Sequence, residues 1–166
     1  MRPLDEYEAE DFLNSPKTRR LLKKIGSDAA APLGALEDFE RHPLYRKALR
    51  FGTYVQRVAR LYRPRRRKKD PKPVDELVLQ AYMAGASIAA GVGRIDDLEI
   101  GFSIAYLKRA LRSTHRALQA LHDVRTARNL PEKAADHVTR RLISLRDDVV
   151  GEVMTLREEW RSKFAH

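Results

Sequence analysis

The apolar residues that follow Pro43 recur at alternating steps of four and three, which is the repeat of one face of an α-helix. The first such stripe consists of Leu44, Ala48, Phe51, Val55, Val58 and Tyr62. A stripe of this kind belongs to a helix that buries one face against a core. Pro64 then stops the helix, because proline lacks the amide donor and disfavours helical geometry in the residue before it. The pattern predicts a helix over about residues 43–62.

A second helix is expected to begin near Pro73, since proline suits a first turn and Asp75 and Glu76 follow at the positive end of the helix dipole. It runs to about Gly91, and its inner stripe consists of Leu77, Ala81, Ala84 and Ile88. Its other positions leave hardly any charged face, because they include Val78, Tyr82, Gly85, Ala86 and Ala89. Such a helix is expected to be buried on most sides, by the bundle or by a neighbouring subunit.

Two further helices are expected in the C-terminal half of the chain. The segment Gly91-Val92-Gly93-Arg94 ends the second helix, and Asp96 with Glu99 resembles a capping box that opens the third. The stripe of the third helix consists of Ile100, Ile104, Leu107, Leu111, Leu118 and Leu121. The pattern lapses over residues 125–129, and Pro131 marks a new start. The stripe of the fourth helix consists of Ala135, Val138, Leu142, Leu145, Val149, Val153, Leu156 and Trp160.

Together these elements predict an all-α fold, namely an antiparallel four-helix bundle with an N-terminal extension. Residues 1–41 are expected to form an arm, partly flexible, because their few apolar residues could not make a core alone. Residues 42–166 are expected to form the bundle, with a basic loop at residues 63–73. A chain of 166 residues has the length of one ordinary domain.

Composition narrows the classes of function. The chain has no cysteine, no apolar signal-peptide core near its start and no apolar run of the roughly 20 residues that a spanning helix needs. These features predict a cytoplasmic protein that does not span a membrane. The net charge of +10 indicates attraction to polyanions, and first to nucleic acid.

The positive charge is concentrated in two places. Residues 60–72 contain a dense basic run with the single acid Asp70, and the neighbouring Tyr62 could stack on an exposed base. A second set has helical spacings of three and four in the third helix, and Arg140 and Arg141 are expected to extend it. The candidate nucleic-acid-binding residues are Arg60, Arg63, Arg65, Arg66, Arg67, Lys68, Lys69, Lys72, Lys108, Arg109, Arg112 and Arg116. Helical faces rich in arginine, without groove-reading asparagine or glutamine, indicate phosphate contacts with little sequence discrimination.

The common catalytic templates are missing. The sequence contains neither a Gly-x-Ser-x-Gly elbow nor a Gly-x4-Gly-Lys-Ser/Thr phosphate loop, and no glutamate is followed by histidine in the Glu-x-x-His spacing of di-iron bundles. Arg109 to His115 and Arg116 to His122 each read Arg-x5-His, which resembles the motif of the helical ribonucleases called HEPN domains. Such matches arise easily by chance in an arginine-rich chain. We therefore expect no enzyme activity, no metal and no cofactor.

Three segments resemble a known family. They are Ala-Gly-Ala-Ser-Ile-Ala-Ala-Gly-Val-Gly-Arg at residues 84–94, Phe-Ser-Ile-Ala-Tyr-Leu at residues 102–107 and Leu-Pro-Glu-Lys at residues 130–133. They resemble the four-helix-bundle proteins encoded in intervening sequences of bacterial large ribosomal RNA genes, and the related accessory variability determinant proteins of diversity-generating retroelements. The resemblance covers roughly residues 43–160, and the basic loop and the charge favour the retroelement branch.

The resemblance implies a ring-like homopentamer whose basic surface binds a reverse transcriptase and its template RNA. It also implies that the apolar second helix supplies the subunit contacts. The sequence as a whole therefore predicts a non-catalytic accessory protein that binds RNA or DNA, forms a homo-oligomer and has a reverse transcriptase as its partner. Two alternatives stay open, a HEPN-like ribonuclease and a small helical scaffold subunit of a nucleoprotein complex of the CRISPR type.

Overall fold

The computed structural model describes residues 39–62, 71–93 and 99–164. Within these ranges the chain forms helices and no strands, which confirms the all-α prediction. The long helices are α4 (Pro43–Tyr62), α5 (Lys72–Val92), α6 (Ile100–Thr126) and α7 (Glu132–Phe164). Residues 39–41 are also helical. The predicted arm, apart from residues 39–41, and most of the predicted basic loop lie outside the described residues.

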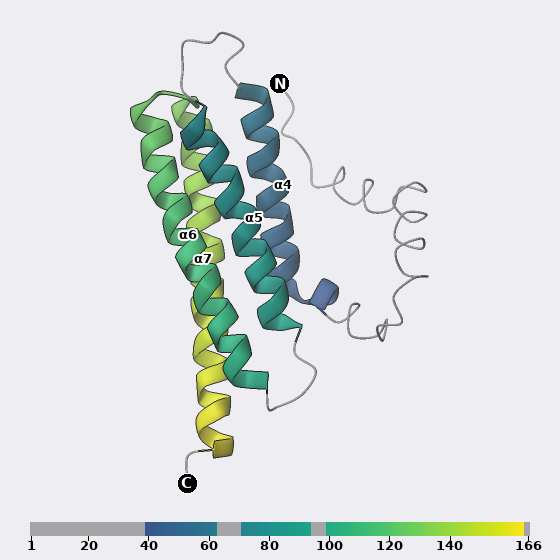
Figure 1. Ribbon diagram of the computed structural model, residues 1–166. Helices are drawn as coiled ribbons and strands as arrows, with labels where there is room; N and C mark the ends of the chain where they lie inside the picture. The colour runs from purple at the N-terminus through teal and green to yellow at the C-terminus, as the bar shows by residue number, and fades with distance from the viewer. Residues whose placement is uncertain (1–38, 63–70, 94–98, 165–166) are drawn as a thin grey trace, which may run out of the picture.

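The long helices pack side by side as a bundle (Figure 1). Helix α5 contacts α4 and α6, and α7 contacts α6 and α4, so each helix has two neighbours. In Figure 1 the chain runs up α4, down α5, up α6 and down α7. The end of α4, the start of α5, the end of α6 and the start of α7 therefore share one end of the bundle, which we call the upper end.

The core lies where the predicted stripes of the helices meet. The buried apolar side chains of α4 and α5 include Leu44, Ala48, Phe51, Val55, Val58, Leu77, Ala81, Ala84 and Ile88. The buried face of α6 is rotated around the helix relative to its predicted stripe, because Ala110, Ala117 and Val124 are fully buried while Leu111 and Leu118 are only half-buried. Small side chains on α6 thus let a neighbouring helix approach closely.

Gly91 makes the closest helix approach that the structure describes at a glycine. A Cβ atom at this position would lie 2.8 Å from Cγ of Leu107 on α6. The helix itself ends one residue later at Val92, and the Gly93 amide donates to the carbonyl of Ala89 at 3.0 Å. The predicted stop is therefore confirmed, but Gly91 serves packing between α5 and α6, whereas Gly93 caps the helix. Asp96, the expected cap of the next helix, lies outside the described residues.

Helix α6 ends at a left-handed residue. Arg128 has a φ of 52°, and the amide of Asn129 donates to the carbonyl of Val124 at 3.0 Å while the Arg128 amide donates to Arg125. These are the two hydrogen bonds of a Schellman motif, in which glycine usually occupies the left-handed position. This turn explains why the apolar pattern lapses over residues 125–129.

The prediction that Trp160 belongs to the buried stripe of α7 is wrong. Its side chain is 41% exposed, and its ring lies 4.5 Å from the ring of Phe164. Helix α7 has 33 residues against 20 in α4 and 21 in α5, and it extends beyond them at the lower end (Figure 1). Trp160 therefore lies where neither of these helices can cover it, and it packs beside Gly101 at the start of α6.

The bundle leaves the outer face of α5 open. Leu79 is 51% and Tyr82 is 42% exposed, and Ala86 and Ala90 continue the same exposed stripe. The described residues therefore do not bury α5 on most sides, because among them its main helix contacts are with α4 and α6. None of the helices in the described part of the chain combines the length and apolar character required to cross a membrane.

Candidate nucleic-acid interface

Four basic side chains form a row on α6. Lys108, Arg109, Arg112 and Arg116 are all exposed, and we call them the α6 basic face. Their spacings of one, three and four residues place them on one side of the helix. The sequence from residue 100 to residue 122 contains no aspartate or glutamate, so no carboxylate on this stretch of α6 balances them.

Elsewhere in the part of the chain that the structure describes, some basic side chains form ion pairs between helices. Lys47 pairs with Asp148 across α4 and α7, and Arg125 pairs with Asp136 at 2.6 Å across α6 and α7. By contrast, no side chain of the α6 basic face forms an ion pair or a hydrogen bond with a described residue. The positive potential of this face is therefore left for a ligand to neutralise.

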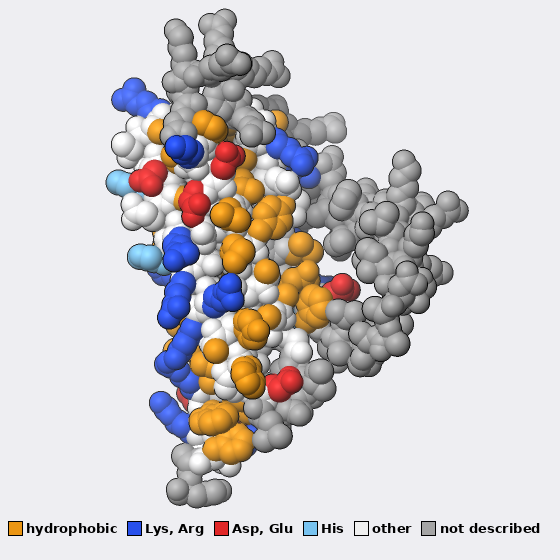
Figure 2. Space-filling model, viewed as in Figure 1, with side chains coloured by type: hydrophobic (Ala, Val, Ile, Leu, Met, Phe, Trp, Pro, Cys, Tyr) orange, Lys and Arg blue, Asp and Glu red, His pale blue; other side chains and the backbone are white. Residues whose placement is uncertain are grey.

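Figure 2 shows Lys and Arg side chains gathered along the left of the molecule, over α6 and α7, beside a band of hydrophobic side chains. On α6, Leu111, Arg112, His115 and Arg116 line a shallow depression of about 330 Å³. Its half-buried Leu111 and exposed cations could accept a ligand that carries both apolar and anionic groups.

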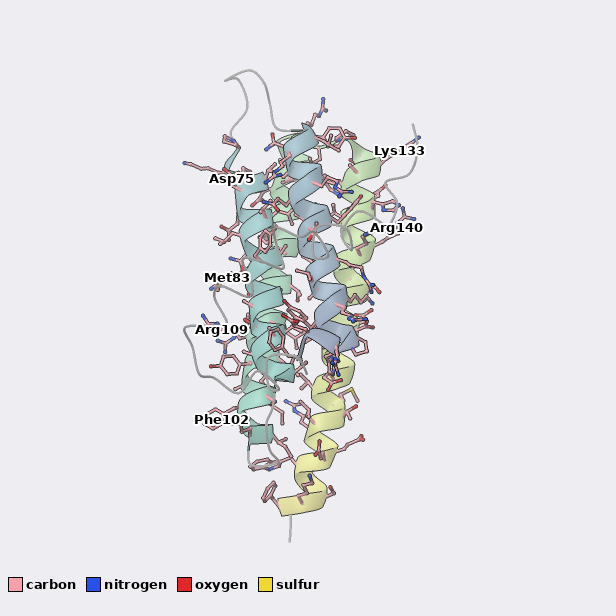
Figure 3. The ribbon with its side chains drawn as sticks, turned by 90° about the vertical axis from the view of Figure 1, so that its right-hand side faces the viewer. Asp75, Met83, Phe102, Arg109, Lys133 and Arg140 are labelled. Carbon is pink, nitrogen blue, oxygen red and sulfur yellow. The ribbon has the colours of Figure 1, made fainter. Side chains whose placement is uncertain are left out.

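Two of the remaining candidate residues belong to the upper end of the bundle. Arg60 is exposed in the last turn of α4, and Lys72 is exposed at the first residue of α5. The candidates Arg63, Arg65, Arg66, Arg67, Lys68 and Lys69 lie outside the described residues. The exposed Lys133 at the start of α7 shares this end with Arg60 and Lys72 (Figures 1 and 3), although the sequence analysis did not select it. In an antiparallel bundle, the start of the fourth helix lies at the same end as the start of the second, so the sequence could have placed Lys133 at the upper end.

Arg140 and Arg141 do not extend the α6 basic face. Figure 3 shows Arg140 on the opposite side of the bundle from Arg109. The Arg141 guanidinium lies over the ring of Tyr54 on α4, 4.2 Å from its centroid, which is cation–π geometry. Burial raises the pKa of the Tyr54 hydroxyl, and the positive charge of Arg141 opposes that rise. Both arginines therefore belong to the α4–α7 side.

The chain matches no family model, and no curated protein and no solved structure matches it either.

The two Arg-x5-His matches do not form adjacent pairs on α6. His115 and His122 are exposed, but each follows its arginine by six residues, which corresponds to about 120° around a helix after whole turns are removed. Arg109 and His115 consequently point in different directions within one chain. Among the described residues, no three histidine or carboxylate side chains come close enough together to hold a metal ion.

Proposed function

We propose that this protein is a non-catalytic accessory protein that binds nucleic acid through the α6 basic face. The observation that supports the proposal is the exposed row of Lys108, Arg109, Arg112 and Arg116, which has no carboxylate partner among the described residues. A surface of this kind attracts polyanions because binding releases the counterions that surround the phosphates.

The length of the α6 basic face suits several consecutive phosphates. Residues 108 and 116 are eight positions apart, or about 12 Å along a helix at 1.5 Å per residue. Phosphates follow one another at about 3.4 Å per strand along a duplex axis, so about four fit this length. Arginine side chains also match phosphate oxygens with pairs of parallel N–H donors. The proposal therefore favours contacts to the backbone over sequence readout.

Three finer features belong to the same proposal. An antiparallel four-helix bundle is supported by the reversal of chain direction between successive helices in Figure 1. A homo-oligomer is supported by the open apolar face of α5, where Leu79 and Tyr82 are exposed. A reverse transcriptase partner, a pentameric state and a cytoplasmic location are supported only by the sequence and by the resemblance of residues 84–94, 102–107 and 130–133.

The test is binding of the purified protein to a labelled structured RNA across a salt series. The first variant carries Arg109→Gln, Arg112→Gln and Arg116→Gln. A matched control carries three changes to exposed arginines outside α6, namely Arg46→Gln, Arg50→Gln and Arg140→Gln, and it loses the same net charge. We expect the α6 variant to bind much more weakly. Its plot of log affinity against log salt should become shallower by about 2, because three phosphate contacts are lost and each single-strand contact contributes about 0.7 to the slope.

The control variant should keep most of the affinity and nearly the whole salt slope. Equal losses in both variants would show that net charge, and not the α6 basic face, drives binding. An absence of binding at low salt would overturn the proposed function. Shortening of the RNA by wild-type protein would instead favour the HEPN-like ribonuclease, and substitution of His115 or His122 would then abolish the cleavage.

A further inference from the structure

The first two turns of α6 expose two aromatic rings. Phe102 is 71% exposed, which is the largest value among the exposed large hydrophobic side chains of the described residues, and Tyr106 is 40% exposed. A phenylalanine left in water forgoes the favourable free energy that its burial would bring. A stable helix that presents such a ring has a surface suited to binding a flat apolar group.

Phe102 is in register with the α6 basic face. Phe102, Arg109 and Arg116 are seven residues apart, and seven residues fall only about 20° short of two full turns, so the three side chains follow one line along the helix. Figure 3 shows Phe102 and Arg109 at the same edge of the bundle. Tyr106 lies between them in sequence, one turn after Phe102. Along this side of α6, the two aromatic rings therefore come first and the arginine side chains follow.

We propose that this line binds single-stranded nucleic acid, with unpaired bases stacked on Phe102 and Tyr106 and phosphates on the α6 basic face. This inference rests on the proposed function and names its ligand class. Every base has a flat π-face that stacks on an aromatic ring, whereas the bases of a duplex are already paired and stacked and cannot reach Phe102. The line from residue 102 to residue 116 is about 21 Å long, which accommodates several consecutive nucleotides of a single strand.

Charge complementarity favours this ligand over a second copy of the chain. If two copies met through this line, Arg109 and Arg116 of one would approach the same cations of the other, and no carboxylate between residues 100 and 122 could compensate. A polynucleotide supplies both the negative charge and the flat apolar faces. The open apolar face of α5 stays available for contacts between subunits.

The experiment measures affinity of the full chain for a labelled oligouridylate and for a blunt RNA duplex of the same length. Phe102→Leu keeps an apolar side chain of similar size but removes the ring, and Phe102→Trp keeps a ring. We expect Phe102→Leu to bind the single strand roughly 5- to 150-fold more weakly, as for loss of one stacked base. Phe102→Trp should bind the single strand at least as well as wild type, and neither change should alter duplex binding.

Met154→Ala is the control for surface apolarity, because Met154 is 56% exposed on α7, and this variant should bind like wild type. Unchanged single-strand affinity in Phe102→Leu, or an equal loss for single strand and duplex, overturns the stacking proposal while the proposed function stands. Failure of the wild type to bind either RNA overturns the proposed function itself. Loss of an oligomer in Phe102→Leu, seen as a smaller mass in sedimentation, would assign Phe102 to a subunit contact and also overturn the stacking proposal.

Discussion

Two glycines of α5 have opposite surroundings, although both lie inside the same helix. A Cβ atom at Gly91 would come within 2.8 Å of the Leu107 side chain and 3.2 Å of the Ser103 carbonyl oxygen, whereas a Cβ atom at Gly85 would meet nothing within 4 Å. Glycine inside a helix is less favourable than alanine, so its presence at Gly91 has a packing reason that is missing at Gly85.

This contrast gives a matched pair of variants. We expect Gly91→Ala to lower the free energy of unfolding by about 1–3 kcal/mol, because the added methyl group forces α5 and α6 apart. We expect Gly85→Ala to raise it by about 0.5–1 kcal/mol through better helix propensity. Urea denaturation followed by circular dichroism measures both values. A gain in stability for Gly91→Ala would mean that the two helices separate without cost.

The end of α6 depends on a single residue whose backbone conformation a helix-propensity scale does not predict. Arg128 adopts a positive φ at the end of α6, a position where glycine is usual. The Schellman hydrogen bonds from Arg128 and Asn129 back to Arg125 and Val124 compensate for this backbone strain. The turn brings α7 back beside α6, where Arg125 pairs with Asp136.

At the scale of an element, α5 divides its apolar residues between two environments. Leu77 is 1% exposed and contributes to the core, while Leu79, two residues further along, is 51% exposed on the outer face. Two residues correspond to about 200° around a helix, so the two side chains point in nearly opposite directions. Hydrophobicity alone therefore does not tell which face of α5 supports the fold.

Truncating each leucine separates the two roles. We expect Leu77→Ala to lower the free energy of unfolding by about 2–5 kcal/mol, since it leaves a cavity in the core. We expect Leu79→Ala to change it by less than about 0.5 kcal/mol in the monomer, as for other surface substitutions. Chemical denaturation at low protein concentration measures both. A large loss for Leu79→Ala that depends on protein concentration would place this face in a subunit contact.

For the molecule as a whole, the uneven distribution of charge matters more than its sum. Lys47 and Arg125 are paired with carboxylates of α7, but the α6 basic face adds four positive charges with no such partner among the described residues. Like charges so close together repel one another and destabilise the compact state. Salt shortens the range of this repulsion from about 30 Å at 0.01 M to about 8 Å at 0.15 M.

We therefore expect the midpoint temperature of thermal unfolding, Tm, to rise when the ionic strength increases over this range. A stabilisation of about 1 kcal/mol would correspond to about 2–4 °C. The variant that carries Arg109→Gln, Arg112→Gln and Arg116→Gln should show a smaller rise than the control with Arg46→Gln, Arg50→Gln and Arg140→Gln. Calorimetry at several salt concentrations measures the effect. A Tm that falls with salt would show that the ion pairs, and not the repulsion, dominate.

Much of the fold could be predicted from local patterns. The spacing of apolar residues located all four long helices, and proline and glycine marked the start of α5 and its end. These signals are local, because the helical repeat and the backbone preferences of proline and glycine act within a few residues. The unbalanced charge of α6 was likewise visible in the sequence, since no carboxylate lies between residues 100 and 122.

Other features of the structure depend on contacts between residues that are far apart in the sequence. The exposure of Trp160 depends on how far α7 extends past its neighbours, and the position of Arg141 over Tyr54 depends on how α4 meets α7. The tight contact at Gly91 depends on the separation between α5 and α6. A periodic pattern fixes which side chains share a face, but the neighbours of that face are set by packing. The seven-residue spacing in the sequence is enough to align Phe102 with Arg109 on one side of a helix. The exposure of the Phe102 side chain to solvent, in contrast, is decided by how the helices pack in the bundle.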